Sequence, residues 1–459
     1  MPMLRVKLGI LVAALLLAGA MRPAGPALAE SNAELDALNN QVQQLYLAGK
    51  YDEALPVAKL QVEVAEKSLT PNHPNITIAF NNLAEVLRVT SQFNEAEPLF
   101  RRALTRRTWS FSRRPARLQL GAADMKFGVF DHMDDGGIPL CQQFATRMQL
   151  AEAYDSFGFH AYHLAEHHGT PLGLAPSPGL FMAALAQRTK RLRFGPLVYL
   201  LPLYHPLRLI EEICMLDHMS GGRLELGVGR GVSPIEVGFF GVDPADGPRQ
   251  FPEALRVIKQ GLISDVLNFE GEFYRFKDVP IVLSPLQKPH PPLWYGVATP
   301  EASVWAARER ANIAMRVPAP AARAIADRFR AEWNEVGHPQ DPPPLIGLNR
   351  HIVLADNEAE ARRVIERAYR RWRRHMEILW LQHGRQFPLV LPQEVGPLLA
   401  AGGAFAGTAA AARRYIAEQI ETSGANYFIC AISFGDITLE EGKRTVELLG
   451  REVMPELAG

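Results

Sequence analysis

The sequence has few cysteines. Its 459 residues include three, Cys141, Cys214 and Cys430, which lie far apart. No CxxC pair occurs, so neither a disulfide framework nor a cysteine-based metal site is expected. Each cysteine has largely apolar neighbours in the sequence, and we therefore expect all three to be buried free thiols.

Neither sign of charge is in excess. The chain has 49 basic and 49 acidic residues, which argues against a nucleic-acid-binding surface but leaves room for a local anion site. Hydrophobic residues make up 47% of the chain, enough for a large buried core. A chain of this length can hold one large barrel together with a smaller segment.

The N-terminal region lacks an apolar run long enough to span a bilayer, for which about 20 residues are needed. Its apolar run, Leu8–Ala20, follows Arg5 and Lys7 and precedes the small-residue sequence Ala27-Leu28-Ala29. This order is typical of a cleaved secretory signal, and residues 1–29 are predicted to be a signal peptide. The alternative is an uncleaved membrane anchor.

Residues 30–107 contain two copies of a helical pattern. Segments 38–59 and 80–101 repeat each other 42 residues apart, and they share paired asparagines, a Glu-Ala pair and a proline. The pattern resembles tetratricopeptide repeats of the kinesin-light-chain type, which stack and present a groove for a peptide or protein partner. Residues 108–124 contain a proline and a basic cluster, and we interpret them as a linker.

From residue 125 to residue 459, short apolar runs alternate with amphipathic segments. The expected strands are 126–130, 159–163, 192–197, 223–228, 292–297, 312–317, 345–354 and 427–432. The expected helices are 141–156, 178–189, 206–219, 251–267, 300–310, 321–336, 358–383, 408–422 and 438–453. Alternating strands and helices pair in parallel, so the sequence predicts an α/β fold, a TIM (β/α)8 barrel with an inserted hairpin at 268–282, preceded by the small all-α helical-repeat segment. The alternative is an open doubly wound sheet.

Chemistry in a TIM barrel lies where strands end, and polar segments follow four of the expected strands. These segments are Glu166-His167-His168, Tyr204-His205-Pro206, Gly229-Arg230-Gly231 and Thr299-Pro300-Glu301-Ala302-Ser303. Because carboxyl ends of parallel strands share one rim, these residues are expected to meet there. Adjacent histidines behind a glutamate favour catalysis, although a surface loop can have the same pattern.

Two of these segments suit an anion. The guanidinium of Arg230 can bind two phosphate oxygens at once, the alternative being a surface ion pair. The surrounding glycines do not have the spacing of a dinucleotide fingerprint. Thr299 and Pro300 are typical of a helix start, whose free N–H groups bind anions, the alternative being ordinary capping.

The ordered set of motifs over residues 125–455 resembles the bacterial luciferase-like, flavin-dependent monooxygenase family. The motifs are Gly158-Phe159, Glu166-His167-His168, Tyr204-His205-Pro206, Leu216-Asp217, Ser220-Gly221-Gly222-Arg223, Gly229-Arg230-Gly231, Gln287-Lys288-Pro289-His290-Pro291-Pro292 and Glu452-Val453-Met454-Pro455.

The resemblance implies that reduced FMN and O2 oxygenate a small organic substrate, with a separate flavin reductase as partner and a homodimeric assembly. His167 would be catalytic, with Glu166 or His168 fixing its tautomer. Arg230, with Gly229 and Gly231, and the segment Thr299, Glu301, Ala302 and Ser303 would hold the FMN phosphate. A non-proline cis peptide is expected at Leu197-Val198.

Two positions depart from the family. Gly229 replaces a reactive cysteine of luciferase, and Arg316 puts a charge where the family often has an apolar flavin wall; both argue against light emission and a long-chain aldehyde. Glu236 is expected to be a solvated carboxylate.

Alternatives are a deazaflavin-dependent hydride transfer on the same barrel and an exported, peptide-binding repeat protein with a non-catalytic barrel. Reduced-flavin chemistry and unpaired cysteines favour the cytoplasm, whereas use of the signal would place the protein in the periplasm or outside the cell.

Overall fold

The computed structural model describes residues 125–336, 343–389 and 391–457, the helices α2 (Tyr51–Ser68) and α3 (Pro74–Val89), and single positions near these helices. The chain divides into two compact units, Met1–Gln119 and Leu120–Gly459. The predicted signal peptide and linker lie outside the described residues. Within the described parts of both units, none of the helices combines the length and apolarity needed to cross a membrane.

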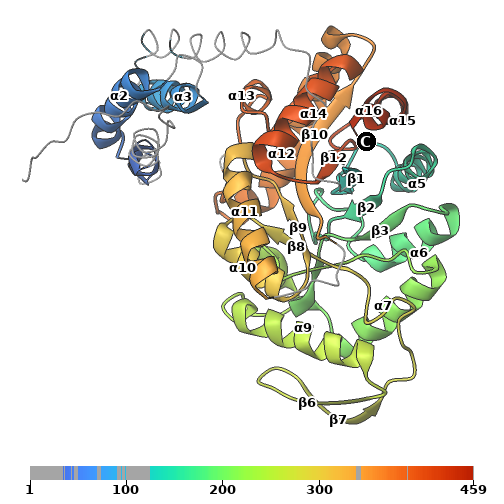
Figure 1. Ribbon diagram of the computed structural model, residues 1–459. Coiled ribbons are helices and arrows are strands. Elements are labelled where there is room, and N and C mark those ends of the chain that lie inside the picture. The colour runs from blue at the N-terminus through green and yellow to red at the C-terminus, as the bar shows by residue number, and fades with distance from the viewer. Residues whose placement is uncertain are drawn as a thin grey trace, which may run out of the picture. The chain divides into compact units, whose positions relative to one another are not determined.

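In the smaller unit, α2 and α3 pack against each other (Figure 1). Ala54 and Ala58 of α2 are buried against Val86 and Leu87 of α3. The amide of Asn82 donates hydrogen bonds to Asn39 Oδ1, at 2.8 Å, and to Gln61 Oε1, at 2.9 Å. The asparagines that the two sequence copies share therefore join the copies through side-chain hydrogen bonds.

The larger unit is a nearly closed barrel of parallel strands (Figure 1). Its strands are β1 (Lys126–Asp131), β2 (Ala161–Leu164), β3 (Arg193–Pro196), β4 (Tyr199–Leu200), β5 (Leu226–Gly229), β8 (Leu293–Val297), β9 (Asn312–Met315), β10 (Ile346–Leu354) and β12 (Tyr427–Ala431). They follow the order β3-β2-β1-β12-β10-β9-β8-β5-β4, and a parallel bridge between Phe194 and Leu224 joins β3 to the segment before β5. The predicted TIM barrel is confirmed, and the open sheet was the wrong alternative.

Helices cover the outside of the barrel at the predicted places. They are α5 (Leu140–Phe157), α6 (Pro178–Arg188), α7 (Pro206–Ser220), α9 (Gly247–Ile263), α10 (Pro300–Arg308), α11 (Ala319–Glu335), α12 (Glu358–Gln382), α14 (Ala409–Ser423) and α15 (Leu439–Leu448), followed by a π-helical turn at Leu449–Val453 and by α16 (Met454–Leu457). The inserted hairpin is confirmed as the antiparallel pair β6 (Val266–Glu270) and β7 (Arg275–Pro280). The predicted helix 251–267 ends earlier because its last residues enter β6.

Several short elements were not predicted. They include α8 (Pro234–Phe239), α13 (Gly396–Ala400) and β11 (Ala404–Gly407), which pairs with β10. Each is too short to give a periodic pattern of apolar residues. The predicted third strand, 192–197, corresponds to β3, and β4 follows beyond it. The Leu197-Val198 peptide between β3 and β4 is cis, as expected.

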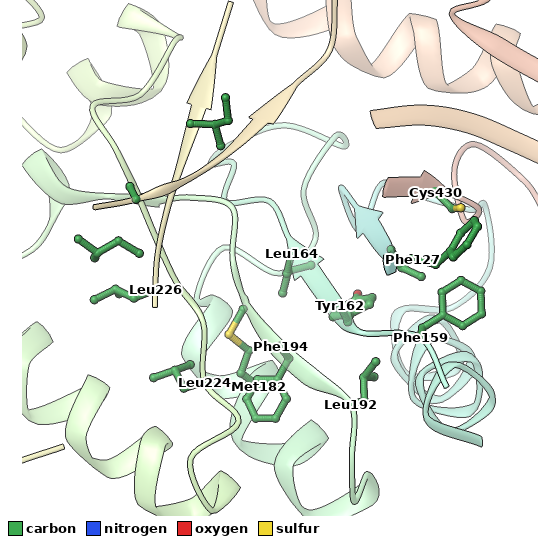
Figure 2. Close-up of a cluster of buried hydrophobic side chains, with 14 of the residues drawn as sticks. Phe127, Phe159, Tyr162, Leu164, Met182, Leu192, Phe194, Leu224, Leu226 and Cys430 are labelled. Carbon is green, nitrogen blue, oxygen red and sulfur yellow. The ribbon is translucent and has the colours of Figure 1, made fainter. Parts of the chain in front are cut away.

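Strand side chains alternate between two cores. Outward-facing residues pack against the helices, and Figure 2 shows Phe127, Tyr162 and Phe194 within this shell. Inward-facing Trp294, Tyr427 and Ile429 fill the barrel itself. Because both faces of several strands are buried, these strands are short apolar runs, and this explains why they could be found from their sequence.

Two of the three cysteines are buried. Cys214 and Cys430 are buried, as predicted, but Cys141 is exposed, so the prediction was wrong for that residue. Cys141 lies in the first turn of α5, where the side chain's direction around the helix, rather than its apolar neighbours in the sequence, sets its exposure.

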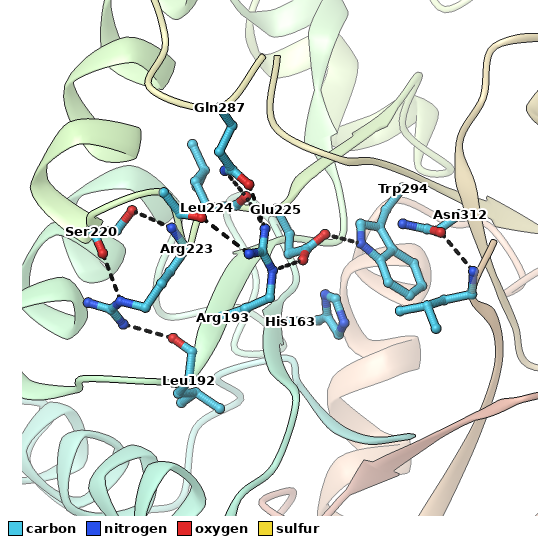
Figure 3. Close-up of polar contacts among 12 residues, drawn as sticks. His163, Leu192, Arg193, Ser220, Arg223, Leu224, Glu225, Gln287, Trp294 and Asn312 are labelled. Carbon is cyan, nitrogen blue, oxygen red and sulfur yellow. Dashed lines mark hydrogen bonds and ion pairs between the residues drawn. The ribbon is translucent and has the colours of Figure 1, made fainter. Parts of the chain in front are cut away.

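Polar side chains close the amino-terminal end of the barrel (Figure 3). Trp294 Nε1 donates to Glu225 Oε2 at 2.6 Å, and Arg193 forms an ion pair with the other Glu225 oxygen. Arg193 also donates to Gln287 Oε1 at 2.8 Å. Since this end is filled by paired side chains, the carboxyl ends of the strands are the candidate place for a ligand.

Candidate active site

Glu166 anchors the loop that follows β2. It is 3% exposed, and its Oε2 accepts the Leu200 N–H at 2.9 Å. Its Oε1 accepts the Tyr204 hydroxyl at 3.0 Å and the His168 Nε2–H at 2.9 Å. Both oxygens are thus occupied in tying the β2 loop to the segment after β3, and neither orients His167.

Glu236 orients His167 instead. The His167 Nδ1 lies 3.2 Å from Glu236 Oε2, and the His168 backbone N–H donates to the same oxygen at 2.8 Å. Glu236 is 4% exposed, so the expectation of a solvated carboxylate was wrong, as was the expectation that Glu166 or His168 fixes the tautomer. The short helix α8, which begins after the capping residue Ser233, carries Glu236 into the site.

The charge state of Glu236 determines what His167 can do. Burial favours the neutral carboxyl, but the hydrogen bonds from His167 and from the His168 N–H outweigh burial and lower the pKa of Glu236. A carboxylate can only accept, so the His167 Nδ1 carries a proton. The Nε2 of His167 is then the ring atom that remains to exchange a proton with a ligand.

His132, which was not predicted, lies beside His167. It follows β1, and its ring stacks on the His167 ring with centroids 5.8 Å apart. Trp372 Nε1 points at His132 Nδ1 over 3.5 Å. Burial first, and then the charge of Arg316, lower the pKa of His132 well below its ordinary value, so it is neutral at pH 7. Its position directly after a buried strand was the signal that could have identified it.

Arg316 follows β9 at the same rim. Its guanidinium carbon lies 4.7 Å from the centroid of the Trp372 ring, and its Nη2 points at His351 Nδ1 over 3.4 Å. Trp372, on α12, is fully buried. Arg316, the charged residue that departs from the family pattern, therefore lies at the rim with its guanidinium over the buried Trp372 ring.

Arg230 lies at the end of β5 and is exposed. Within the described residues it makes no hydrogen bond or ion pair, and its charge acts on the phenol of Tyr295 on the adjacent strand β8. Gly231 has a φ of 85°, which favours glycine. At Gly229 an added Cβ would lie 2.4 Å from Val198 Cγ2, so this position has no room for a side chain. The bare backbone of Gly229 is therefore free to lie close to a ligand.

The first turn of α10 follows β8. Thr299 caps it by accepting the Ala302 N–H at 3.3 Å, while the Ser303 hydroxyl is buried and donates to Pro300 O at 2.6 Å. Glu301 is exposed. The helix start retains its favourable dipole and first-turn N–H groups. Because β5 and β8 are neighbours, Arg230 and this helix start lie on the same part of the rim.

Metal chemistry has no support from side-chain grouping in residues 125–336, 343–389 and 391–457, or in the described part of the repeats. No three His, Cys, Asp or Glu side chains there are placed to hold a metal ion. The candidate site instead combines an uncompensated arginine, a helix start and a group of histidines, which suits an organic anion.

Comparison with known proteins agrees with this geometry. The model of the luciferase-like monooxygenase family matches residues 125–426, and a tetratricopeptide repeat model matches residues 34–108. The chain belongs to the luciferase-like monooxygenase family, and it is an oxidoreductase of the flavin-dependent monooxygenase class.

Two curated relatives cover the barrel. The uncharacterized protein y4wF of Sinorhizobium fredii is 42% identical over 330 residues, which are 72% of this chain and 96% of that protein. The oxygenase component of the flavin-dependent trigonelline monooxygenase of Acinetobacter baylyi is 30% identical over 243 residues, 52% of this chain and 67% of that protein.

Solved structures share the fold. Monooxygenase RslO1 of Streptomyces bottropensis has a TM-score of 0.66 and 26% identity, covering 72% of this chain and 99% of its own. The oxygenating constituent of 3,6-diketocamphane monooxygenase of Pseudomonas putida, in complex with FMN, has a TM-score of 0.62, 20% identity and coverage of 73% and 99%. The coenzyme F420 dependent tetrahydromethanopterin reductase of Methanopyrus kandleri has a TM-score of 0.55, 18% identity and coverage of 73% and 100%.

Proposed function

We propose that the barrel binds reduced FMN at its carboxyl rim and uses O2 to oxygenate a small organic substrate. The observation that supports FMN most directly is Arg230, an exposed cation with no partner among the described residues, on the rim that also carries the start of α10. An arginine and a helix N-terminus together match a phosphate monoester. The FMN complex of the diketocamphane enzyme supports the same choice.

Each part of the rim has its own task in this proposal. Reduced flavin supplies the reaction with oxygen when it is bound. Arg230 and the α10 start hold the phosphate, and Gly229 and Gly231 let the backbone approach the cofactor. His167 holds or releases a proton at Nε2, and Glu236 keeps its ring in place. The neutral His132 beside it, backed by Trp372, helps to exclude water from this face of the site.

The decisive experiment is an anaerobic titration of the protein with reduced FMN, repeated with the oxidised forms of FMN and riboflavin. We expect micromolar binding of FMN, a loss of at least about tenfold for FMN in Arg230→Ala, and little change for riboflavin, which has no phosphate. Arg323→Ala on α11, where Arg323 pairs with Asp327, is the matched control. No micromolar binding, or unchanged binding in both Arg230→Ala and His167→Ala, contradicts the proposal.

A deazaflavin-dependent hydride transfer is the second candidate. It is supported by the shared fold of the F420 dependent reductase, and absorption spectra of the protein titrated with each cofactor separate the two. The non-catalytic barrel has lost its support, because relatives along the barrel are named as monooxygenases.

Partners follow from the same reasoning. A separate flavin reductase is proposed because the Acinetobacter relative is named as an oxygenase component. The tetratricopeptide repeats are proposed to bind a peptide or protein partner. A homodimer is proposed because Leu180 on α6 and Met215 and Met219 on α7 expose apolar side chains on neighbouring helices.

We propose the cytoplasm as the location of the enzyme, where reduced flavin is supplied. Mass spectrometry of the native N-terminus tests this: a mature chain that begins at residue 30 would show that the signal is used and would contradict a cytoplasmic location. A chain that begins at Met125 supports it.

A further inference from the structure

Arg316 is a cation without a carboxylate partner. No ion pair joins it to any described residue, and its one hydrogen-bond contact is the 3.4 Å approach to His351 Nδ1. Burial, followed by the charge of Arg350, lowers the pKa of Arg316 to about 10, so the side chain is still positive at pH 7. The side chain is nevertheless exposed, so an anion that enters from the carboxyl rim can reach it.

His351 carries an unused donor beside this cation. An arginine can only donate, so the Nδ1 of His351 accepts and its Nε2 carries the proton. The ring is 2% exposed, and the Nε2 is buried without a partner. Burial first, and then the charges of Arg316 and Arg350, lower the pKa of His351 well below its ordinary value, so the ring is neutral. The Nε2 lies on the edge of the ring away from Arg316 and is buried, so His351 gives Arg316 no compensating charge and offers no donor to a ligand there.

The neighbouring groups supply no negative charge. Arg350 is held by neutral oxygens, those of Gln419 Oε1, Asn349 O and Val317 O. Asp134, a nearby buried acid, is engaged with His375, at 3.3 Å, and with the Gly435 N–H, at 2.7 Å. Two arginines and neutral histidines therefore give this side of the rim a positive potential.

We propose that Arg316 binds the carboxylate of an organic-acid substrate. Its planar guanidinium can donate two N–H groups to the two oxygens of a monoanion. The ring systems of Trp372 and His132 form an aromatic wall beside the anchor, against which an aromatic or hydrocarbon body can pack. The inference rests on the proposed function, since it assigns the substrate of that site.

The proposed site for the flavin phosphate is separate from the proposed site for the substrate carboxylate. Arg230 and the α10 start belong to β5 and β8, whereas Arg316 contacts His351 of β10 and Trp372 of α12. The cofactor would thus be held on one part of the rim, and the substrate carboxylate on another part, next to the His132–His167 pair.

The test is isothermal titration of the flavin-free protein with benzoate and hexanoate, each compared with its uncharged amide, benzamide or hexanamide. At least one carboxylate is expected to bind about tenfold or more tightly than its amide, and Arg316→Gln to abolish this preference. Arg323→Gln is the control and keeps the preference. Thermal unfolding of each variant confirms that it is folded, and Arg316→Lys, which keeps the charge, retains part of the preference.

Two results overturn the proposal. One is a wild-type protein with no preference for either carboxylate, or a preference that Arg316→Gln leaves intact. The other is a variant Arg316→Gln that weakens FMN but not riboflavin, which would assign Arg316 to the flavin phosphate. The carboxylates are titrated without flavin, so the two proposals are tested by separate measurements. Failure of FMN to bind the wild-type protein contradicts the proposed function, whereas the carboxylate titration alone decides whether Arg316 binds an anion.

Discussion

His167 and Glu236 lie 69 residues apart in the chain, and 3.2 Å separates His167 Nδ1 from Glu236 Oε2. Glu236 also accepts the backbone N–H of His168, so one carboxylate fixes both the ring and the loop that carries it. The pair joins the end of β2 to the short helix after β5. The catalytic candidate is consequently held by a residue from a different strand–helix unit.

Replacing Glu236 by Gln is expected to lower the free energy of unfolding by about 1–3 kcal/mol at pH 7, because hydrogen bonds to a carboxylate become hydrogen bonds to a neutral amide. The folded-state pKa of Glu236 is lowered, so its stabilisation is present above the unfolded pKa, about 4.3, and is lost as the pH falls through the folded value. Urea unfolding at pH 7 and at successively lower pH measures this difference.

The matched control is Glu335→Gln, at an exposed position at the end of α11. It is expected to change stability by less than about 0.5 kcal/mol. A Glu236→Gln variant whose stability loss is the same at all pH values would show that the carboxylate is not the stabilising form.

The barrel could be predicted from sequence because strand and helix periodicities are local properties. The strands that contain Tyr162 and Phe428 are short runs in which every residue is buried, and a cap such as Thr299 lies next to the helix it begins. Placing Glu166, Arg230 and Thr299 on one rim required only the rule that parallel strands end together.

The partners of the site residues could not be predicted, because they depend on distances between units far apart in the chain. Glu236 looked like a surface carboxylate because α8 is too short to show a buried face in its sequence. His351 lies inside β10, where a histidine looks like any other strand residue, and only its contact with Arg316 shows that its Nε2 lacks a partner.

Gly229 is expected to tolerate no side chain. An alanine Cβ there would meet Val198 Cγ2 at 2.4 Å, and a cysteine, the residue of luciferase at this place, would meet the same atom. Gly229→Ala should lower the free energy of unfolding by about 1–3 kcal/mol, as measured by chemical denaturation. Adding Val198→Ala removes the contact and should recover part of the loss.

Gly238→Ala is the control for this prediction, since no atom lies within 4 Å of the Cβ that it would add. Equal losses at Gly229 and Gly238 would mean that the Val198 contact is not what excludes a side chain. A double variant no more stable than Gly229→Ala would lead to the same conclusion.

The proposed homodimer depends on the apolar surface of α6 and α7. Leu180 is 78% exposed and Met215 is 55% exposed, and apolar patches of this kind are typical of interfaces. Changing both residues to Glu should convert a dimer to a monomer in light scattering coupled to size-exclusion chromatography. Leu389→Glu, at a position 63% exposed on another part of the barrel unit, should leave the dimer intact. A wild-type protein that is monomeric at all concentrations contradicts the assignment.

Arg316 and Arg350 are expected to respond differently to loss of charge in the ligand-free protein. Arg316→Met should change the free energy of unfolding by less than about 0.5 kcal/mol, because the side chain is exposed and makes no ion pair with a described residue, while the aliphatic chain still packs on Trp372. Arg350→Met should lower it by about 2–4 kcal/mol, because three oxygens, those of Gln419, Asn349 and Val317, lose their donors. Chemical denaturation of both variants measures the contrast. If Arg316→Met destabilises the protein as much as Arg350→Met, then Arg316 serves the fold, and its position at the rim is no longer evidence for a ligand.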